Sequence, residues 1–222
     1  AYGTERADRM AIAHLAGGAL DLTCKTDPAA WAERLGGRLL PTGSVRIDDR
    51  RPVTELAGFG DGGWWVQDAA AALPARLVRA KKGERVLDLC AAPGGKTLQL
   101  AVTGAKVTAL DRSAARLERL AQNLRRLKLK AEIVCADGLD YAAEPFDAVL
   151  LDAPCTATGT VRRHPDVAWT KGEADLGALV DLGRRLLDRG ADLVRPGGRL
   201  VFCVCSLERE EAEDQAAAFL AR

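Results

Sequence analysis

The segment Val86–Thr97, which reads VLDLCAAPGGKT, constrains the fold of this 222-residue chain more than any other stretch. Its first residues form a short apolar run that predicts a buried strand, and Pro93-Gly94-Gly95 ends that run before a helical pattern resumes. A strand, a glycine turn and a helix in this order are typical of the first βαβ unit of a nucleotide-binding sheet. The glycines allow close approach of a ligand to the backbone, and the helix N-terminus offers unpaired N–H groups.

The segment matches neither of the common phosphate-binding motifs. It is not a G-x-G-x-x-G pattern, and a Walker loop would need a glycine at the position of Cys90. Two minor alternatives stay open at this point: a phosphate cradle, and a tight turn that binds no ligand.

Strand and helix patterns alternate along the rest of the chain. Apolar runs predict strands over residues 86–89, 106–110, 132–136, 146–151 and 199–205. An amphipathic pattern predicts a helix over residues 113–127, and further helices are predicted over residues 67–80, with a kink or a new start at Pro74, and over 176–193 and 208–221. This alternation favours the α/β class, with a Rossmann-like, doubly wound and mainly parallel sheet.

The sequence before this sheet predicts a small α/β subdomain. Residues 19–23 and 45–47 have strand patterns, and Asp27-Pro28 has the form of a helix start. The expected domains are a linker or the stump of an upstream helical domain (1–18), the small α/β subdomain (19–62) and a larger domain (63–222).

Composition sets broad limits on what the protein does. Hydrophobic residues make up 48% of the chain and charged residues 28%, as in ordinary soluble domains. The net charge of +1 neither favours nor excludes a nucleic-acid partner, and no membrane span or signal peptide is evident. The six cysteines include no C-x-x-C pair, so neither zinc nor any other metal site is expected. Thiols of this kind suggest a cytoplasmic protein, which we expect to be a monomer.

Acidic residues stand at the carboxyl ends of three predicted strands. They are Asp111, Asp137 and Asp152. These strand ends line the ligand crevice of an open parallel sheet, and an acid about 20 residues after the glycine turn usually binds ribose hydroxyls. Three carboxylates would repel a pyrophosphate. The pattern therefore predicts an adenosine-type cofactor without phosphates, and S-adenosylmethionine meets that description.

Two cysteines follow neighbouring strands of the predicted sheet. Cys155 comes after the fourth strand and Cys205 after the fifth, so both thiols are expected at the same crevice. A methyltransferase needs a thiol when its target is a poor nucleophile such as carbon 5 of cytosine. Addition of a thiolate to carbon 6 makes carbon 5 reactive. Asp152 is close enough in sequence to hydrogen-bond the ring nitrogen N3.

Several motifs together resemble one family, the RsmB/Sun-type RNA (cytosine-5)-methyltransferases, over residues from about 20 to the end. The motifs that carry the resemblance are Trp64–Ala70, Asp88–Thr97, Asp152–Thr156, Arg162–Asp166, Cys205–Leu207 and Glu210-Glu211.

The resemblance implies a function and a set of site residues. It implies transfer of a methyl group from S-adenosylmethionine to carbon 5 of a cytosine in RNA, with ribosomal RNA expected. Cys205 would be the nucleophile and Cys155 would assist product release, while the loop 162–166 would lie near RNA. The residues implied to hold the cofactor are Cys90, Ala91, Ala92, Pro93, Gly94, Gly95, Lys96, Asp111, Asp137 and Asp152.

The chain departs from the family pattern in two places. Val204 replaces the threonine that often precedes the nucleophile, and the strands that continue the family's sheet past this segment are absent, which implies a C-terminal truncation.

Alternatives that keep the cofactor site are a methyltransferase for transfer RNA, a small molecule or a protein, and an RNA-binding module without catalysis. Phosphate contacts are expected from one or two of the basic clusters at Arg46, Arg50 and Arg51; Arg76, Arg79, Lys81 and Lys82; Arg125, Arg126, Lys128 and Lys130.

Overall fold

The computed structural model describes residues 3–49 and 51–222. Arg50 of the first basic cluster and the first two residues of the segment 1–18 therefore lie outside the described residues. The chain divides into two compact units. The larger unit comprises Leu20–Ala153 and Arg185–Cys203, and the smaller unit comprises the residues up to Ala19, Pro154–Arg184 and Val204–Arg222.

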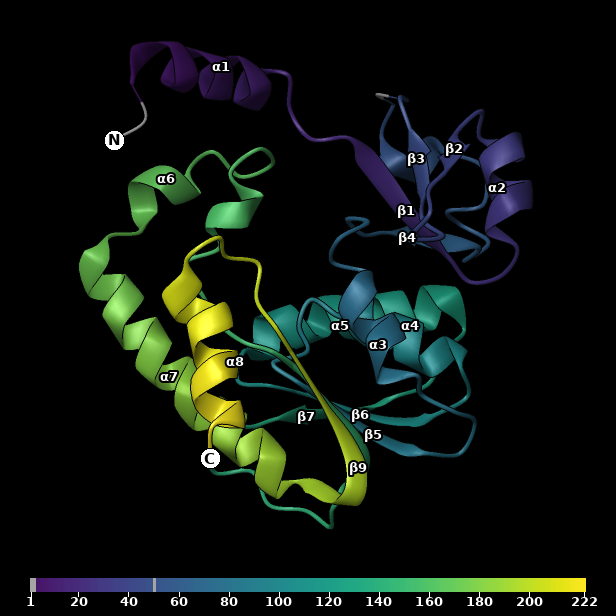
Figure 1. Ribbon diagram of the computed structural model, residues 1–222. Coiled ribbons are helices and arrows are strands. Elements are labelled where there is room, and N and C mark those ends of the chain that lie inside the picture. Colours follow the sequence, from purple (N-terminus) through teal and green to yellow (C-terminus); the bar gives the residue numbers. More distant parts are fainter. Residues whose placement is uncertain (1–2, 50) are drawn as a thin grey trace. The chain divides into compact units, whose positions relative to one another are not determined.

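The larger unit is built on a five-stranded sheet in which every pair of neighbouring strands is parallel (Figure 1). The strands in order across the sheet are β7 (Glu132–Cys135), β6 (Lys106–Asp111), β5 (Arg85–Leu89), β8 (Phe146–Asp152) and β9 (Val194–Cys203). The chain enters at the centre with β5, moves outward through β6 and β7, and returns to the other side at β8. This reversal defines a Rossmann-like doubly wound sheet, so the predicted fold class is confirmed.

Apolar residues bury the central strands on both faces, as expected for a parallel sheet covered by helices. In β5, Val86, Leu87 and Leu89 are fully buried. Helices α3 (Leu73–Val78), α4 (Gly95–Val102) and α5 (Ala114–Leu127) cover one face (Figure 1). On the other face, Gly190 of α7 (Glu173–Asp192) lies close to side chains of β5, β8 and β9.

Helix α5 follows from its sequence in detail. The hydroxyl of Ser113 accepts a hydrogen bond from the backbone N–H of Arg116, which satisfies one of the unpaired donors at the helix start. The leucines that recur every three or four residues are all buried, and they are Leu117, Leu120, Leu124 and Leu127. The predicted helix over residues 113–127 is therefore confirmed.

The larger unit also contains a small four-stranded sheet near its beginning (Figure 1). Its strands, in spatial order, are β2 (Arg38–Leu39), β3 (Val45–Ile47), β1 (Leu20–Cys24) and β4 (Trp64–Val66), and every neighbouring pair is antiparallel. Helix α2 (Pro28–Arg34) packs on it, and the Asp27 carboxylate caps that helix by accepting from Ala30 N at 3.0 Å. The predicted helix start at Asp27-Pro28 is therefore confirmed.

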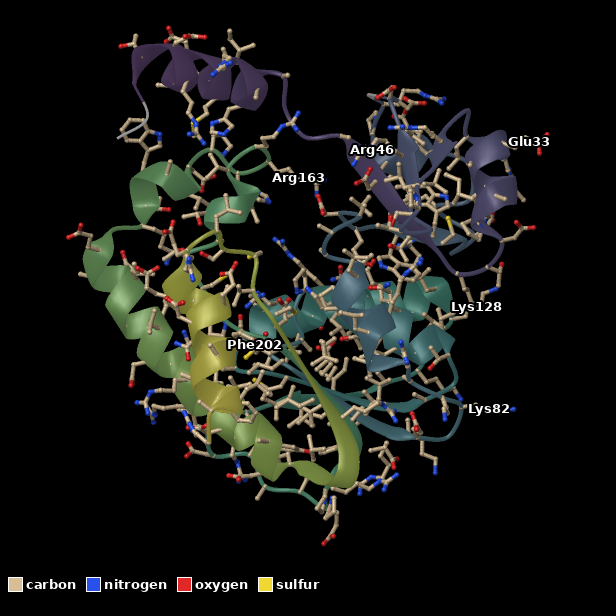
Figure 2. All side chains as sticks on the ribbon, in the orientation of Figure 1. Glu33, Arg46, Lys82, Lys128, Arg163 and Phe202 are labelled. Atoms are coloured by element: carbon tan, nitrogen blue, oxygen red, sulfur yellow. The ribbon has the colours of Figure 1, made fainter. Side chains whose placement is uncertain are left out.

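A partly buried ion pair joins β1 to β3 in the small sheet, and its carboxylate also contacts the segment that follows the sheet. Asp21 is 1% exposed, and its two oxygens accept hydrogen bonds of 2.7 and 2.9 Å from Arg46 on β3 (Figure 2). The same carboxylate also accepts from Ala69 N at 3.1 Å. A planar guanidinium suits this two-point contact, so Arg46 has a structural task in the small sheet.

The smaller unit is mainly helical. Its elements are α1 (Thr4–Leu15), the 3₁₀ turn η2 (Thr158–Thr160), α6 (Val167–Thr170), the first part of α7, the 3₁₀ turn η3 (Arg209–Glu211) and α8 (Glu213–Leu220). A further 3₁₀ turn, η1 (Val53–Glu55), belongs to the larger unit.

The structure differs from the sequence predictions at several places, among them the last helix, which begins at Glu213 rather than at residue 208. Strand β4 pairs with β1, so the small sheet continues past the expected boundary at residue 62. The helix expected over residues 67–80 forms only at α3, because the Asp68 carboxylate accepts from Ala70 N and makes a turn instead. The last strand ends at Cys203 rather than at Cys205. The carbonyl of Cys205 instead accepts a hydrogen bond from Gly159 N.

Candidate active site

The glycine turn between β5 and α4 has a backbone shape that only glycine adopts easily. Gly94 has a φ of +108°, in the region that side chains disfavour. A Cβ placed on Gly94 would lie 2.6 Å from Cγ of Leu120, so the turn packs directly against α5. This close packing brings the start of α4 to the carboxyl edge of the sheet, where ligands of such folds bind.

Asp111, at the end of β6, holds the glycine turn in place. One carboxylate oxygen accepts a hydrogen bond from Ala92 N at 3.0 Å, and the other accepts from Ser113 N at 2.9 Å. The guanidinium of Arg116 lies 3.5 Å from this carboxylate and also donates to the carbonyl of Ala92. Asp111 is 3% exposed, so it joins the turn, β6 and the start of α5 into one rigid corner.

Asp88 is the most deeply buried acid of the site. It is fully buried within β5, and one of its oxygens accepts a hydrogen bond of 2.5 Å from the hydroxyl of Thr97 on α4. Its other oxygen, Oδ1, has no hydrogen-bond partner among the described residues. Burial raises the pKa of Asp88 from 3.8 to about 7, although the hydrogen bond from Thr97 acts in the opposite direction.

The raised pKa of Asp88 makes stability depend on pH. Between 3.8 and about 7 the folded protein holds a proton that the unfolded chain has released, so this contribution to stability is lost as the pH rises through about 7. We expect Asp88→Asn, which stays neutral, to flatten the pH dependence of the free energy of unfolding in urea between about pH 4 and pH 7. Across this range the change in the free energy of unfolding should differ between the variant and the parent protein by up to about 4 kcal/mol, three pKa units at ~1.4 kcal/mol each. Parallel slopes for the variant and the parent protein would contradict the assignment.

Asp152, at the end of β8, accepts hydrogen bonds from two neighbouring elements. Lys96 of α4 donates to Oδ2 at 2.7 Å, and the thiol of Cys203 on β9 donates to Oδ1 at 3.5 Å. Burial lowers the pKa of Lys96, but Asp152, together with Cys203 and Asp88, outweighs burial and the net shift is upward. Burial and the nearby Asp152 raise the pKa of Cys203, which keeps this sulfur protonated as a donor to the carboxylate.

Two other predicted site residues have different surroundings. Asp137 is exposed in the turn after β7, and its side chain accepts from Leu139 N at 2.9 Å. Cys90 begins the glycine turn with a φ of 65°, and its thiol is half-buried. Burial and Asp111 raise the pKa of Cys90 to about 12, so its sulfur is unreactive and only its backbone is suited to a ligand.

The smaller unit brings together the two cysteines that the sequence singled out. The sulfur atoms of Cys155 and Cys205 lie 3.5 Å apart, although the residues are 50 positions apart in the chain. The hydrogen bond from Cys205 lowers the pKa of Cys155 to about 7, and burial acts against this shift. Near neutral pH the thiol of Cys155 is therefore partly ionised.

The sequence analysis did not assign Asp88, Cys203 or Arg116 to the site. The structure shows that the thiol of Cys203 contacts Asp152. Its signal in the sequence is its position opposite Asp152, since both residues end neighbouring parallel strands. Arg116 forms an ion pair with Asp111.

The described part of the chain has no helix that combines the length and apolar character needed to cross a lipid bilayer. Within the same part of the chain, no cluster of three or more histidine, cysteine or acidic side chains has an arrangement that could hold a metal ion.

Comparisons with curated proteins point to one family. The profile of a family described as 16S rRNA methyltransferase RsmB/F matches residues 75–222. The chain is 44% identical over 185 residues to ribosomal RNA small subunit methyltransferase B of Cronobacter sakazakii, covering 81% of this chain and 43% of that protein. The protein of the same name from Vibrio vulnificus is 44% identical over 176 residues, covering 77% of this chain and 41% of its own length. The chain thus spans less than half the length of these relatives.

Solved structures agree with this relationship. A methyltransferase homolog protein from Pyrococcus horikoshii has a TM-score of 0.84 and 29% identity, and the match covers 98% of this chain and 74% of that one. NSun6 from Pyrococcus horikoshii, solved with SFG, has a TM-score of 0.70 and 30% identity, with 77% and 45% covered. The family match includes the whole five-stranded sheet, the glycine turn and both paired cysteines. The chain is therefore a member of the RsmB/F family of 16S rRNA methyltransferases.

Proposed function

We propose that this protein transfers a methyl group from S-adenosylmethionine to carbon 5 of a cytosine in ribosomal RNA. The observation that carries the proposal is the pair of sulfur atoms, 3.5 Å apart, on the two loops that follow β8 and β9. A methyltransferase that acts on a nitrogen or oxygen atom has no need of a thiol, because such atoms are already nucleophilic. Carbon 5 of cytosine is not, so it calls for covalent catalysis.

The residues at the carboxyl edge of the sheet fit S-adenosylmethionine. When bound, it would supply an electrophilic methyl group on a positively charged sulfur. The site offers carboxylate acceptors at Asp111, Asp137 and Asp152 beside the turn Cys90–Lys96, a set that suits ribose hydroxyls and amino groups and disfavours phosphates. We assign cofactor binding to these residues, with Ala91, Ala92, Pro93, Gly94 and Gly95 acting through their backbone.

The thiol pair suggests how the nucleophile is activated. The thiolate of Cys155 accepts the hydrogen bond of Cys205, so it can take the proton and leave Cys205 as a thiolate. Cys205 Sγ then forms a bond to carbon 6, and carbon 5 gains the electron density needed to accept the methyl group. After a base removes the proton from carbon 5, the bond between sulfur and carbon 6 breaks and its electrons return to Cys205. Cys155 assists this release by supplying a proton to the departing sulfur.

Asp152 is assigned to the hydrogen bond with the ring nitrogen N3 of cytosine. Thiolate addition to carbon 6 makes N3 basic, and once N3 has taken up a proton from water its N–H can donate to the Asp152 carboxylate. Lys96 and Cys203 hold both oxygens of Asp152 at 2.7 and 3.5 Å and so fix the orientation of its carboxylate. We assign to Lys96 and Cys203 the task of keeping Asp152 correctly oriented.

Side-chain contacts favour some of the basic residues expected to contact RNA over others. Three of the arginines already have partners within the protein. Arg46 forms an ion pair with Asp21, and Arg51 forms one with Asp49. Arg126 donates to the carbonyls of Phe59 and Trp64. Lys82 and Lys128 are exposed, and their side chains extend outward from the larger unit (Figure 2). We propose that Lys82 and Lys128 contact RNA phosphates. We also propose that residues 19–62 contribute to binding RNA in which the target cytosine is flipped out or single-stranded.

Asp111 provides a quantitative test of the cofactor site. We expect Asp111→Ala to weaken binding of S-adenosylmethionine by about 1–3 kcal/mol, the cost of leaving buried polar partners unpaired. Ala92 N and Ser113 N also lose their acceptor, but they do so with and without cofactor, so that loss lowers the free energy of unfolding, whereas the loss of affinity comes from the cofactor hydroxyls left without Asp111. Titration calorimetry measures the effect, with the exposed Asp140→Ala as the control. Equal affinities for Asp111→Ala and the parent protein would remove Asp111 from the site.

The overall reaction is tested with the full-length protein, labelled S-adenosylmethionine and total bacterial RNA. The proposal predicts label at carbon 5 of a cytosine in small-subunit ribosomal RNA, found by digestion and mass spectrometry. Label confined to transfer RNA or to protein would contradict it. We also propose that the protein acts as a monomer in the cytoplasm, where its six thiols stay reduced.

A further inference from the structure

Glu211 is a buried carboxylate for which the reaction described above has no use. It ends the 3₁₀ turn η3 and is 3% exposed. Burial of a carboxylate is costly unless hydrogen bonds compensate for the lost water. Both of its oxygens accept hydrogen bonds from one residue, Thr156: from its backbone N–H at 2.8 Å and from its hydroxyl at 2.6 Å.

Thr156 directly follows Cys155, so its hydrogen bonds to Glu211 hold the loop that carries this cysteine. The Thr156 hydroxyl also lies 3.1 Å from the hydroxyl of Ser206, the residue that follows Cys205. The chain of contacts therefore runs from Glu211 through Thr156 to Ser206. It joins the two residues that stand immediately after the paired cysteines.

Further hydrogen bonds tie the same two loops together. The Ser206 hydroxyl lies 3.2 Å from that of Thr158, which accepts from Leu207 N at 2.9 Å. Gly159 N donates to the carbonyl of Cys205 at 3.0 Å. Within this network Glu211 is the member that is both buried and charged, and hydrogen bonds to a charged acceptor are the strongest kind.

We propose that Glu211 is a positioning residue, which clamps the Cys155 loop to the Cys205 loop and so sets the distance over which the two thiols share a proton. The catalytic meaning of this clamp rests on the proposed function, whereas the clamp itself is a property of the protein without substrate. Glu211 acts through Thr156 and touches neither sulfur in the contacts described above.

The clamp has two effects on Cys155 that oppose each other. By holding the loops together it preserves the hydrogen bond from Cys205, which lowers the pKa of Cys155 and is the largest influence on it. Backbone N–H groups of Ala157 and Cys205 act in the same direction. The negative charge of Glu211 raises the pKa of Cys155, and so does burial of the thiol. Substitutions that remove the charge alone, or the charge and the clamp together, should therefore shift the pKa of Cys155 in opposite directions.

The test is the pH dependence of alkylation by iodoacetamide, measured separately for the Cys155 and Cys205 peptides by mass spectrometry. It uses the full-length protein without RNA or cofactor. In Glu211→Gln the amide still bonds to Thr156, so the pKa of Cys155 should fall below that of the parent protein. In Glu211→Ala the loops separate, and the pKa should rise toward the ~8.5 of an ordinary cysteine. Thr156→Val removes the hydroxyl that donates to Glu211, so it should also shift the pKa of Cys155 upward.

The exposed neighbour Glu210→Gln is the matched control, and its profile should equal that of the parent protein. If Glu211→Ala does not fold, Glu211→Gln and Thr156→Val still decide the outcome. Unchanged alkylation profiles in both, or the same profile shift in Glu210→Gln, would overturn the proposal. The alkylation measurement involves no methyl transfer. Its result therefore tests the clamp even if the proposed methyltransferase activity is not found. In an active protein, Glu211→Ala should lower kcat and leave the KM for S-adenosylmethionine unchanged.

Discussion

Replacing Cys205 by alanine is expected to abolish methyl transfer to RNA. Removal of a covalent nucleophile lowers turnover by roughly 10⁴-fold or more, because the remaining groups cannot replace the bond it forms. The affinity for S-adenosylmethionine should stay within a few-fold of the parent value. The residues assigned to the cofactor belong to the larger unit, whereas Cys205 belongs to the smaller one. Incorporation of labelled methyl groups and titration calorimetry measure the two quantities.

The control for Cys205→Ala is Cys135→Ala. Cys135 is an exposed thiol at the end of β7, and it takes no part in the proposed reaction. This control should retain full turnover, which separates the specific loss from a general effect of removing a cysteine. Turnover that survives in Cys205→Ala would exclude this residue as the nucleophile.

Replacing Cys155 by alanine should have a different result, because this residue is assigned to a later step. We expect a covalent complex between the protein and RNA to accumulate, since Cys205 can still attack but release from carbon 6 is slowed. The complex should appear as a band of reduced mobility on a denaturing gel, and its amount should increase when S-adenosylmethionine is present. Attack itself should slow as well, because Cys155 no longer takes the proton of Cys205.

The double variant Cys155→Ala with Cys205→Ala is the control for this complex. It should form no covalent band, since the attacking sulfur is then absent. A band of equal strength in the double variant would show that another residue reacts. The absence of any band in Cys155→Ala, in a preparation whose Cys205 remains alkylatable, would contradict the role in release.

The parallel sheet and the thiol pair were predictable from the sequence because both depend on strong local signals. The runs in β5 and β8 are almost wholly apolar, as strands buried on both faces must be. Once these strands are parallel and adjacent, the residues that follow them must emerge at the same edge of the sheet. Cys155 and Cys205 were expected to converge for this reason, and their sulfur atoms lie 3.5 Å apart.

Features decided by tertiary contacts were not predictable in this way. Strand β4 belongs to the small sheet because it pairs with β1, and nothing in its own sequence indicates that partner. The sequence also gives no sign that Glu211 is buried, because an acidic residue near the start of a helix is normally exposed. Asp111 was expected to bind ribose, but the structure shows that it also anchors the glycine turn through Ala92 and Ser113.

The central claim is that Cys205 attacks carbon 6 of a cytosine while Cys155 stands beside it. The most direct measurement uses RNA that contains 5-fluorocytosine, because a base cannot remove fluorine from carbon 5 and the adduct is trapped. After incubation with S-adenosylmethionine and digestion, mass spectrometry identifies the peptide that carries the modified nucleotide. We predict the peptide that contains Cys205, with the added methyl group present on the base. Attachment at Cys155, or no attachment to either cysteine in an active preparation, would contradict this account.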